Sequence, residues 1–384
     1  MNAARAGRHP TARYIEAPDD AERLLASIRG EPIIAVDTEG ASFHRFVDRI
    51  YLLQLSTRAL NAVLDPLAIG TPPSLGVLLQ DPSVETVFHD ADYDLRLLHQ
   101  DYGWHVRNIF DTRVAAQLLG IRAFGLAALL ERYFGVQLDK KWQRADWSTR
   151  PLPPAMLEYA AQDTRYLLQL RDRMRDDLER AGRLPWAEEE FRRMEGTQWN
   201  GDASAGDAFL RLKGARDLSR RELAILRELV AWRDRVAAEV DRATFRVMSN
   251  EALFAIAREA PRELSALEQI KGVPRGLAAR RGDEMLNAVR LGLAVPESEL
   301  PRFPRAPRWE RDPDFDQRVA RLRAVRDTAA HRLDLDPGVL CSRDRLEAIA
   351  RRRPRTVEEL AGVEDLRRWQ VEQLGEELLR AVKG

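Results

Sequence analysis

The first half of the chain alternates short apolar runs with amphipathic segments. Apolar runs between polar turns predict strands over residues 33–36, 50–55, 62–64, 86–88 and 106–110. Apolar residues at helical spacing predict helices over 75–79, 94–101, 112–119, 126–134 and 156–178, the last as one continuous pattern. The first three strands follow one another through short turns, and the later ones alternate with helices. This order predicts an α/β domain built on a mixed sheet.

The second half of the chain is predicted to be all helical, because no convincing strand pattern occurs beyond Leu210. It contains an internal repeat, in which residues 232–289 align without a gap with 325–382 at a constant offset of 93. The matches fall on apolar positions and on the pair Pro261 and Pro354. Two unrelated amphipathic helices could agree in apolar spacing, but the shared proline and loop lengths indicate a duplicated unit. Each copy is expected to be a small helical bundle.

Composition changes at two places that are typical of linkers. With 384 residues, the chain is too long for one ordinary core. One linker contains the Gly/Ala/Ser stretch 201–206, and the other, from Val295 to Pro313 inclusive, contains five prolines. We therefore expect a catalytic domain over 1–190, a linker over 191–210, a helical domain over 211–292, a linker over 293–310 and a second helical domain over 311–384.

The composition also limits where the protein works. No window approaches the ~20 consecutive apolar residues of a membrane span, so we expect no membrane insertion. The N-terminal residues lack the apolar core of a secretory signal. Cys341 is the only cysteine, which excludes an internal disulfide and agrees with a reducing, cytoplasmic setting. Nothing in the pattern implies a protein partner.

Charge is distributed unevenly although the net charge is zero. Residues 1–185 carry 23 basic and 25 acidic side chains, whereas residues 211–291 carry 17 basic and 12 acidic ones. The first helical domain can therefore present a basic surface, which is the electrostatic requirement for binding nucleic acid.

The predicted strand at 33–36 leads into two carboxylates, Asp37 and Glu39. Residues two apart in a strand share a face, so the two acids lie side by side. Acids at the end of a buried strand are costly unless a cation compensates them, and hard oxygen ligands suit Mg²⁺ or Mn²⁺. The alternative is a strand that simply ends in an acidic turn.

Two further acidic segments offer candidate ligands. Asp90, Asp92 and Asp94 have the spacing of a calcium loop, but Leu95 stands where that loop requires glycine. Asp94 opens an apolar helical pattern, and its ordinary role there would be a helix cap or a first-turn acid. Tyr159 and Asp163 are four residues apart on one helical face, a spacing that more often makes a surface contact than a site.

Taken in order, Asp37-x-Glu39, Asp94 and Tyr159-x-x-x-Asp163 resemble the tyrosine subgroup of the DEDD exonuclease superfamily. The segment Gln143-Arg144-Ala145-Asp146-Trp147 resembles ribonuclease D, and the repeated helical units resemble HRDC domains. The resemblance extends from about Tyr14 onward. It implies a ribonuclease H-like catalytic fold and a 3′-to-5′ exoribonuclease that releases nucleoside 5′-monophosphates. The implied substrate is RNA, in particular tRNA precursors in 3′ end maturation.

The resemblance also implies roles for the acids. Asp37, Glu39 and Asp163 would hold one of two divalent ions, Mg²⁺ or Mn²⁺. Asp37 would bridge to the second ion, which Asp94 would support. Asp92 is the fallback for Asp94, because this chain has several acids where the family more often has small residues. Tyr159 would orient or deprotonate the attacking water, and the ordinary tyrosine pKa near about 10 favours orientation.

Other residues are candidates for substrate contact or for structure. Basic residues that could meet RNA phosphates are Lys140, Lys141, Arg144, Arg275, Arg280 and Arg281, although the first three could equally form a solvated basic loop. Trp147 is expected in the core, and Asp111 is expected to cap a helix. The second repeat diverges at Arg351-Arg352-Arg353, so its role in binding is less defined than its fold.

Two other functions compete with the exoribonuclease. A non-catalytic adaptor that binds RNA or DNA would be expected to lack at least one acidic ligand, and all four are present. A DNA 3′-to-5′ exonuclease would share the acids, but the chain has the ribonuclease D-like flank and no helicase or polymerase segment.

Overall fold

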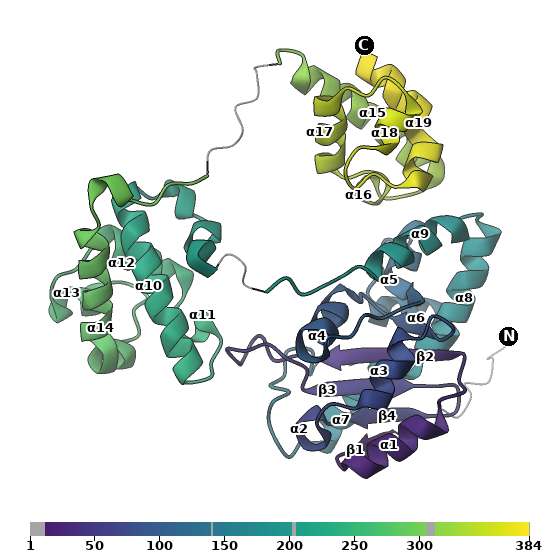
Figure 1. Cartoon of the computed structure of the whole chain (residues 1–384), viewed down its shortest axis with the longest axis horizontal. Coiled ribbons are helices and arrows are strands. Elements are labelled where there is room, and N and C mark those ends of the chain that lie inside the picture. Colours follow the sequence, from purple (N-terminus) through teal and green to yellow (C-terminus); the bar gives the residue numbers. More distant parts are fainter. Residues whose placement is uncertain (1–11, 140, 202–204, 305–311, 384) are drawn as a thin grey trace. The chain divides into compact units, whose positions relative to one another are not determined.

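The computed structural model describes residues 12–139, 141–201, 205–304 and 312–383 (Figure 1). Contacts divide the chain into two units. The first unit combines 1–40 and 50–199 with 309–384, and the second combines 41–49 with 200–308. The second helical domain thus groups with the catalytic domain, although the linkers between them suggest separate bodies. The domain boundaries drawn from the sequence stay a prediction.

In the first unit, the described residues form a six-stranded mixed sheet in the order β1-β4-β3-β2-β5-β6. β2 is antiparallel to β3 and parallel to β5, and the edge strands β1 and β6 pair in parallel with β4 and β5. This confirms the predicted mixed sheet. The strands are β1 (Arg13–Ile15), β2 (Ile33–Glu39), β3 (Leu52–Ser56), β4 (Asn61–Leu64), β5 (Glu85–Phe88) and β6 (Ile109–Asp111).

Helices cover both faces of the sheet (Figure 1). On the face of Ile34 and Val36 pack α1 (Pro18–Ser27), α3 (Pro73–Gln80) and α4 (Asp92–Tyr102). On the face of Ile33 and Ala35 pack α5 (Thr112–Leu118), α8 (Leu167–Arg180) and α9 (Leu184–Met194). The remaining helices are α2 (Pro66–Ile69), α6 (Leu126–Phe134) and α7 (Pro154–Arg165). None of the described helices combines the length and apolar character that crossing a membrane requires.

Some elements differ from the sequence-based expectations. The helical pattern over 156–178 is broken at Tyr166, because α7 packs on β2, β3 and β4 whereas α8 turns toward β5. Apolar spacing does not report such a change of direction. The strand expected over 106–110 is shorter, because pairing with β5 begins only at Ile109. Val106 is buried although it lies before the paired residues, so its apolar character did not mark the strand's start. β1, α1 and α9 were not predicted, although Pro18 and the two acids after it are an N-terminal helix signal.

The described residues of the two helical domains repeat the same order of helices. The first domain contains α10 (Arg220–Glu239), α11 (Thr244–Val247), α12 (Asn250–Glu259), α13 (Leu264–Gln269) and α14 (Arg275–Ala294). The second contains α15 (Phe315–Leu333), α16 (Pro337–Leu340), α17 (Arg343–Arg352), α18 (Val357–Ala361) and α19 (Arg368–Lys383). From α16 to α19, each helix begins 93 residues after its counterpart in the first domain. This agreement in register confirms the predicted duplication.

The second helical domain shares a continuous hydrophobic core with the catalytic domain. At the contact between α9 and α19, the rings of Trp186 and Trp369 stack with centroids 4.9 Å apart and planes 14° apart. Both side chains are buried. Because buried aromatic rings dominate interface energetics, this stack stabilises the docked arrangement.

Candidate active site

Strand β2 carries Asp37 and Glu39 to the rim of the sheet. Ile34, Ala35 and Val36 are fully buried, whereas Asp37 and Glu39 keep some exposure as the strand leaves the core. In the antiparallel register, Asp37 lies opposite Gln54 of β3. The Nε2 of Gln54 lies 3.5 Å from Glu39 Oε1, and its own Oε1 has no partner. The fully buried Gln54 thus borders the acids, which no motif in the sequence indicated.

Helix α7 brings Tyr159 and Asp163 to the same place. It begins with Pro154 at its first turn, where the fixed φ of proline favours a helix start. Two buried polar contacts hold it on the sheet: Asn61 Nδ2 donates to Ala161 O at 2.9 Å, and the hydroxyls of Ser56 and Thr164 lie 2.7 Å apart. These anchors join residues about 100 positions apart, so helical spacing alone could not identify them.

The structure brings Asp37, Glu39 and Asp163 together as one cluster. Each residue offers a carboxylate oxygen, and these oxygens all lie within 4.8 Å of one another. In the part of the chain that the structure describes, no arginine, lysine or histidine forms an ion pair with any of the three. Hard anionic oxygens without a protein countercharge are the donor set that suits a divalent cation. The site therefore fits a divalent metal centre.

Asp94 lies beside this cluster and has its own support. It stands in the first turn of α4 with 5% of its surface exposed. The backbone N–H and the hydroxyl of Thr38 both donate to Asp94 Oδ1, at 2.9 and 2.5 Å. Asp92, in contrast, is exposed and pairs with Arg96. The structure thus places Asp94, and not Asp92, against the β2 acids.

The acids of the site repel one another in a buried setting. Burial, followed by the charge of Asp163, raises the pKa of Asp37 well above its ordinary value. Burial and the nearby acids likewise raise the pKa of Glu39 and of Asp94. Burial and then Asp94 raise the pKa of Asp163 to about 7. A bound cation would relieve this repulsion and favour the ionised carboxylates.

We expect Mg²⁺ to raise the melting temperature more at pH 8 than at pH 6. A raised carboxyl pKa stabilises the metal-free fold when the group is protonated, and this contribution is lost as the pH rises through about 7. At pH 8 the cation replaces the missing protons, and each kcal/mol of stabilisation shifts the melting temperature of a domain of roughly 150–250 residues by about 2–4 °C. Calorimetry in EDTA and in Mg²⁺ measures the increment. It should shrink in Asp163→Asn but not in Asp92→Asn, and an equal increment at both pH values would contradict the assignment.

Tyr159 faces the acids with its ring against Trp147. The two ring centroids are 6.1 Å apart, with planes at 29°. Trp147 is 1% exposed, which confirms its expected place in the core. Burial raises the pKa of the Tyr159 hydroxyl, and the charges of Asp163, Glu39 and Asp37 raise it further. The hydroxyl therefore stays protonated at neutral pH and acts as a hydrogen-bond group.

A groove of about 710 Å³ opens over the acids. Besides the acidic side chains and Tyr159, residues from other elements line it: His89, Arg113, Phe124, Leu138 and Gln143. Arg113 lies 5.0 Å from the ring centroid of Phe124 and pairs with Asp90. Burial lowers the pKa of His89 to about 4, so this ring is neutral. No motif in the sequence indicated Arg113 or Phe124, because only the fold brings them to the groove.

Asp111 caps α5, as expected. Its carboxylate accepts from the backbone N–H groups of Arg113 and Val114, and also from that of Ala91 at 2.7 Å. Burial raises the Asp111 pKa to about 6. The cap thereby fixes the helix that presents Arg113 to the groove.

The remaining candidate substrate contacts are scattered. Lys141 and Arg144 are exposed in the loop whose Gln143 lines the groove, and Lys140 lies outside the described residues. In the second unit, Arg275 and Arg280 are exposed near the start of α14. Arg281 is instead held by Glu239 at 2.7 Å and Glu284 at 3.4 Å. Contact of Arg281 with RNA stays a prediction.

The chain matches known domain families in the order expected. Residues 12–179 match the 3′-5′ exonuclease family, and residues 222–289 and 315–382 each match the HRDC domain. The chain is 32% identical over 354 residues to ribonuclease D of Gluconacetobacter diazotrophicus, covering 89% of this chain and 86% of that protein. Ribonuclease D of Escherichia coli K12 is 33% identical over 291 residues, 76% of this chain and 77% of that one.

Solved structures agree over the whole chain. The crystal structure of Escherichia coli RNase D, described as an exoribonuclease involved in structured RNA processing, matches with a TM-score of 0.74 at 27% identity. The match covers 97% of this chain and 99% of that one. A protein from Bifidobacterium adolescentis matches with a TM-score of 0.83 at 26% identity, covering 100% and 99%.

Proposed function

This chain belongs to the ribonuclease D family of 3′-to-5′ exoribonucleases, and we propose that Asp37, Glu39, Asp94, Tyr159 and Asp163 form its active site. The observation that carries the proposal is the convergence of three carboxylates whose oxygens lie within 4.8 Å of one another, with no ion-pair partner for them among the described residues. Two metal ions, Mg²⁺ or Mn²⁺, would complete the site. Asp37, Glu39 and Asp163 would hold the first ion, Asp37 would bridge to the second, and Asp94 would support it.

Bound divalent ions in such a site acidify a water molecule and stabilise charge on the attacking and leaving oxygens. The protein contributes the placement of these ligands. Thr38 restrains Asp94 through two hydrogen bonds, and Gln54 borders Glu39, so the carboxylates are held before substrate arrives. Preorganised ligands cost no rearrangement during the reaction.

Tyr159 orients the water that attacks the terminal phosphodiester. Its neutral hydroxyl can hydrogen-bond the water oxygen, and the Trp147 ring beneath it limits the motion of the phenol. Attack on phosphorus breaks the bond to the 3′-oxygen of the preceding nucleotide, which takes up a proton and becomes the new 3′ end. The product is a nucleoside 5′-monophosphate.

We propose tRNA precursors as substrates and the cytoplasm as the site of action. The support for the substrate is the role in structured RNA processing described for Escherichia coli RNase D, to which this chain is similar over most of its length. The support for the cytoplasm is that Cys341 is the only cysteine, which agrees with a reducing setting. We retain the sequence-based boundaries of the catalytic domain (1–190) and of the helical domains (211–292 and 311–384) as part of this proposal.

A direct test follows the shortening of 5′-labelled single-stranded RNA and identifies the released nucleotides by chromatography. We expect stepwise shortening from the 3′ end in Mg²⁺ or Mn²⁺, with nucleoside 5′-monophosphates as products, and none in EDTA. Preference for a DNA strand of the same sequence would instead favour a DNA exonuclease, and no cleavage of either strand would favour the adaptor.

The double variant Arg275→Ala, Arg280→Ala is expected to weaken binding to structured RNA. We propose that these exposed arginines, together with Lys140, Lys141 and Arg144, contact phosphates. Removing two phosphate contacts should reduce the slope of log affinity against log salt by about 1.4–1.8. Binding is measured on a tRNA precursor with Ca²⁺ in place of Mg²⁺.

Arg290→Ala, at the other end of α14, is the matched control for this variant. An unchanged slope in the double variant would remove the start of α14 from the RNA surface.

A further inference from the structure

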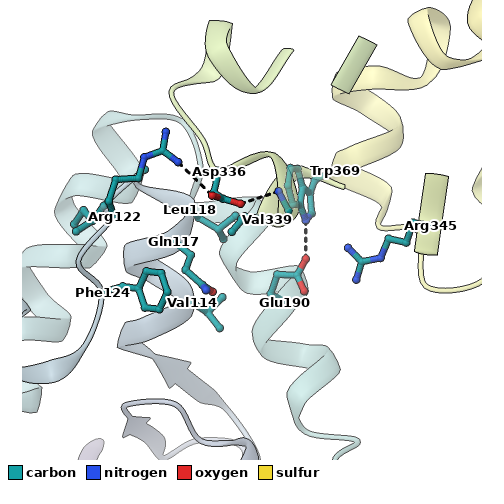
Figure 2. Close-up of a pocket in the computed structure, with 13 residues that line it drawn as sticks. Val114, Gln117, Leu118, Arg122, Phe124, Glu190, Asp336, Val339, Arg345 and Trp369 are labelled. Atoms are coloured by element: carbon teal, nitrogen blue, oxygen red, sulfur yellow. Dashed lines mark hydrogen bonds and ion pairs between the residues drawn. The ribbon is translucent and has the colours of Figure 1, made fainter. Parts of the chain in front are cut away.

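The loop of residues 119–125, between α5 and α6, forms a wall of two cavities. Ala123, Phe124 and Gly125 line the active-site groove. On the other side, Gly120, Arg122 and Phe124 line a cavity of about 500 Å³ between the catalytic domain and the second helical domain (Figure 2). Phe124 therefore borders both the reaction site and the docked domain.

The second helical domain touches this loop directly. Gly120 has φ of +76°, and a Cβ atom there would lie 2.1 Å from the backbone oxygen of Asp334, so only glycine fits. Arg122 forms ion pairs with Asp334 at 3.7 Å and Asp336 at 3.6 Å, the latter visible in Figure 2. The end of α15 and the residues after it thus lie against the loop.

Arg183, between α8 and α9, joins the two domains at the start of the loop. Its Nη1 donates to Leu118 O at 2.7 Å, and its Nη2 donates to Leu333 O. Leu118 is the last residue of α5, and Leu333 is the last residue of α15. Carbonyls in the last turn of a helix lack an intrahelical partner, so one half-buried guanidinium satisfies a helix end from each domain.

Stronger contacts nearby keep the second helical domain docked. Glu190 of α9 accepts from Arg367 at 3.0 Å and from the indole N–H of Trp369 at 2.9 Å, as Figure 2 shows for the indole. Glu189 accepts from the backbone N–H groups of Arg368 and Trp369. With the tryptophan stack, these contacts provide a fixed support on which the loop rests.

On its other side, the loop and the neighbouring helix α5 present groups that suit RNA. The Phe124 ring offers a face for a base, and Arg113, 5.0 Å above it, can meet a phosphate. Among the described residues that line the groove, Arg113 is the one arginine, and no lysine accompanies it. The contacts that hold the loop in place therefore affect where the substrate strand lies in the groove.

We propose that the second helical domain positions loop 119–125 for substrate binding, with Arg183 as the positioning residue and Phe124 as the residue that contacts RNA. The inference rests on the proposed function, because it concerns the strand that enters the proposed active site. It gives the second HRDC domain a role in the active-site groove, in addition to any binding of distant RNA.

The test compares Arg183→Ala with Arg193→Ala. Arg193 also joins the two domains, through Asp365 at 2.6 Å, but it does not touch the loop. On a single-stranded RNA of about five nucleotides, we expect Arg183→Ala to raise KM ~10-fold, within the range of couplings through packed contacts. Both kcat and the Mg²⁺ concentration for half activity should change less than ~2-fold. Arg193→Ala should leave KM unchanged.

A loss of stability alone would lower the melting temperature without this selective effect on KM, so both quantities are measured. Arg183→Lys should give an intermediate KM, because an ammonium lacks the planar fork that spans two carbonyls. Phe124→Leu should also raise KM. Adding Arg183→Ala to it should have little further effect, because Arg183 is proposed to act by positioning the Phe124 ring against RNA.

The outcomes separate this inference from the proposed function. An unmodified chain without metal-dependent nuclease activity would overturn both. An active chain in which Arg183→Ala has normal KM, or in which the two KM effects multiply, would overturn only the positioning role.

Discussion

Asp163→Asn is expected to abolish the metal-dependent release of nucleoside monophosphates, with a loss of turnover of about 10³-fold or more. The amide keeps the shape of the side chain but removes a negative ligand from the cluster with Asp37 and Glu39. A loss of 10³-fold corresponds to about 4 kcal/mol, within the several kcal/mol that metal ions contribute to charge stabilisation in a transition state. RNA affinity should stay within a few-fold of the original, because the carboxylate itself does not attract phosphates.

Turnover is followed on labelled single-stranded RNA over a titration of Mg²⁺ and Mn²⁺. Asp92→Asn makes the same chemical change at an exposed position that pairs with Arg96, and it should retain near-normal turnover. Thermal unfolding in EDTA verifies that Asp163→Asn is folded. Recovery of more than a tenth of the original turnover at any metal concentration would remove Asp163 from the ligands.

The local geometry of the site was predictable because it depends on backbone periodicity. A strand places residues i and i+2 on one face, and a helix places i and i+4 on one face, so Asp37 with Glu39 and Tyr159 with Asp163 follow from spacing. Their convergence did not follow from spacing. It depends on the buried contacts that seat α7 on β3 and β4, and the resemblance to a known family supplied it instead.

The choice between Asp92 and Asp94 shows why packing is needed. Both acids lie in the first turn of α4, where either could favour the helix N-terminus. Only the tertiary structure shows that Asp94 is turned inward onto Thr38 while Asp92 faces solvent beside Arg96. A pattern of acids two residues apart leaves both candidates open.

The docking of the second helical domain had no signal in the sequence. Trp186 and Trp369 each occupy an apolar position of an amphipathic helix, and such a position does not identify its partner. A proline-rich segment before the domain predicted an independent body. The shared core shows that a linker only limits how far a domain can lie from its neighbour, whereas complementary surfaces determine where the domain docks.

Tyr159→Phe is expected to lower turnover by about 10²-fold or more, with little change in the metal concentration for half activity. The substitution removes only the hydroxyl, and positioned proton-transfer groups typically contribute about 10²–10⁴-fold. The phenyl ring can keep its contact with Trp147, so the packing of α7 should survive. Because burial and the three acids raise the Tyr159 pKa, the hydroxyl acts in its neutral form. The variant should therefore lower the rate by the same factor across pH 7 to 9.

Tyr133→Phe is the matched control, since Tyr133 is a part-buried tyrosine that donates to Asp177 at 2.7 Å but does not line the groove. It should leave turnover within ~2-fold of the original. Rates are compared under single-turnover conditions at saturating Mg²⁺, so that product release does not mask the chemical step. If Tyr159→Phe keeps the original rate, another group orients the water. If its defect instead disappears below pH 7 and grows toward pH 9, the phenolate is the active form, and Tyr159 serves as a base rather than as an orienting donor.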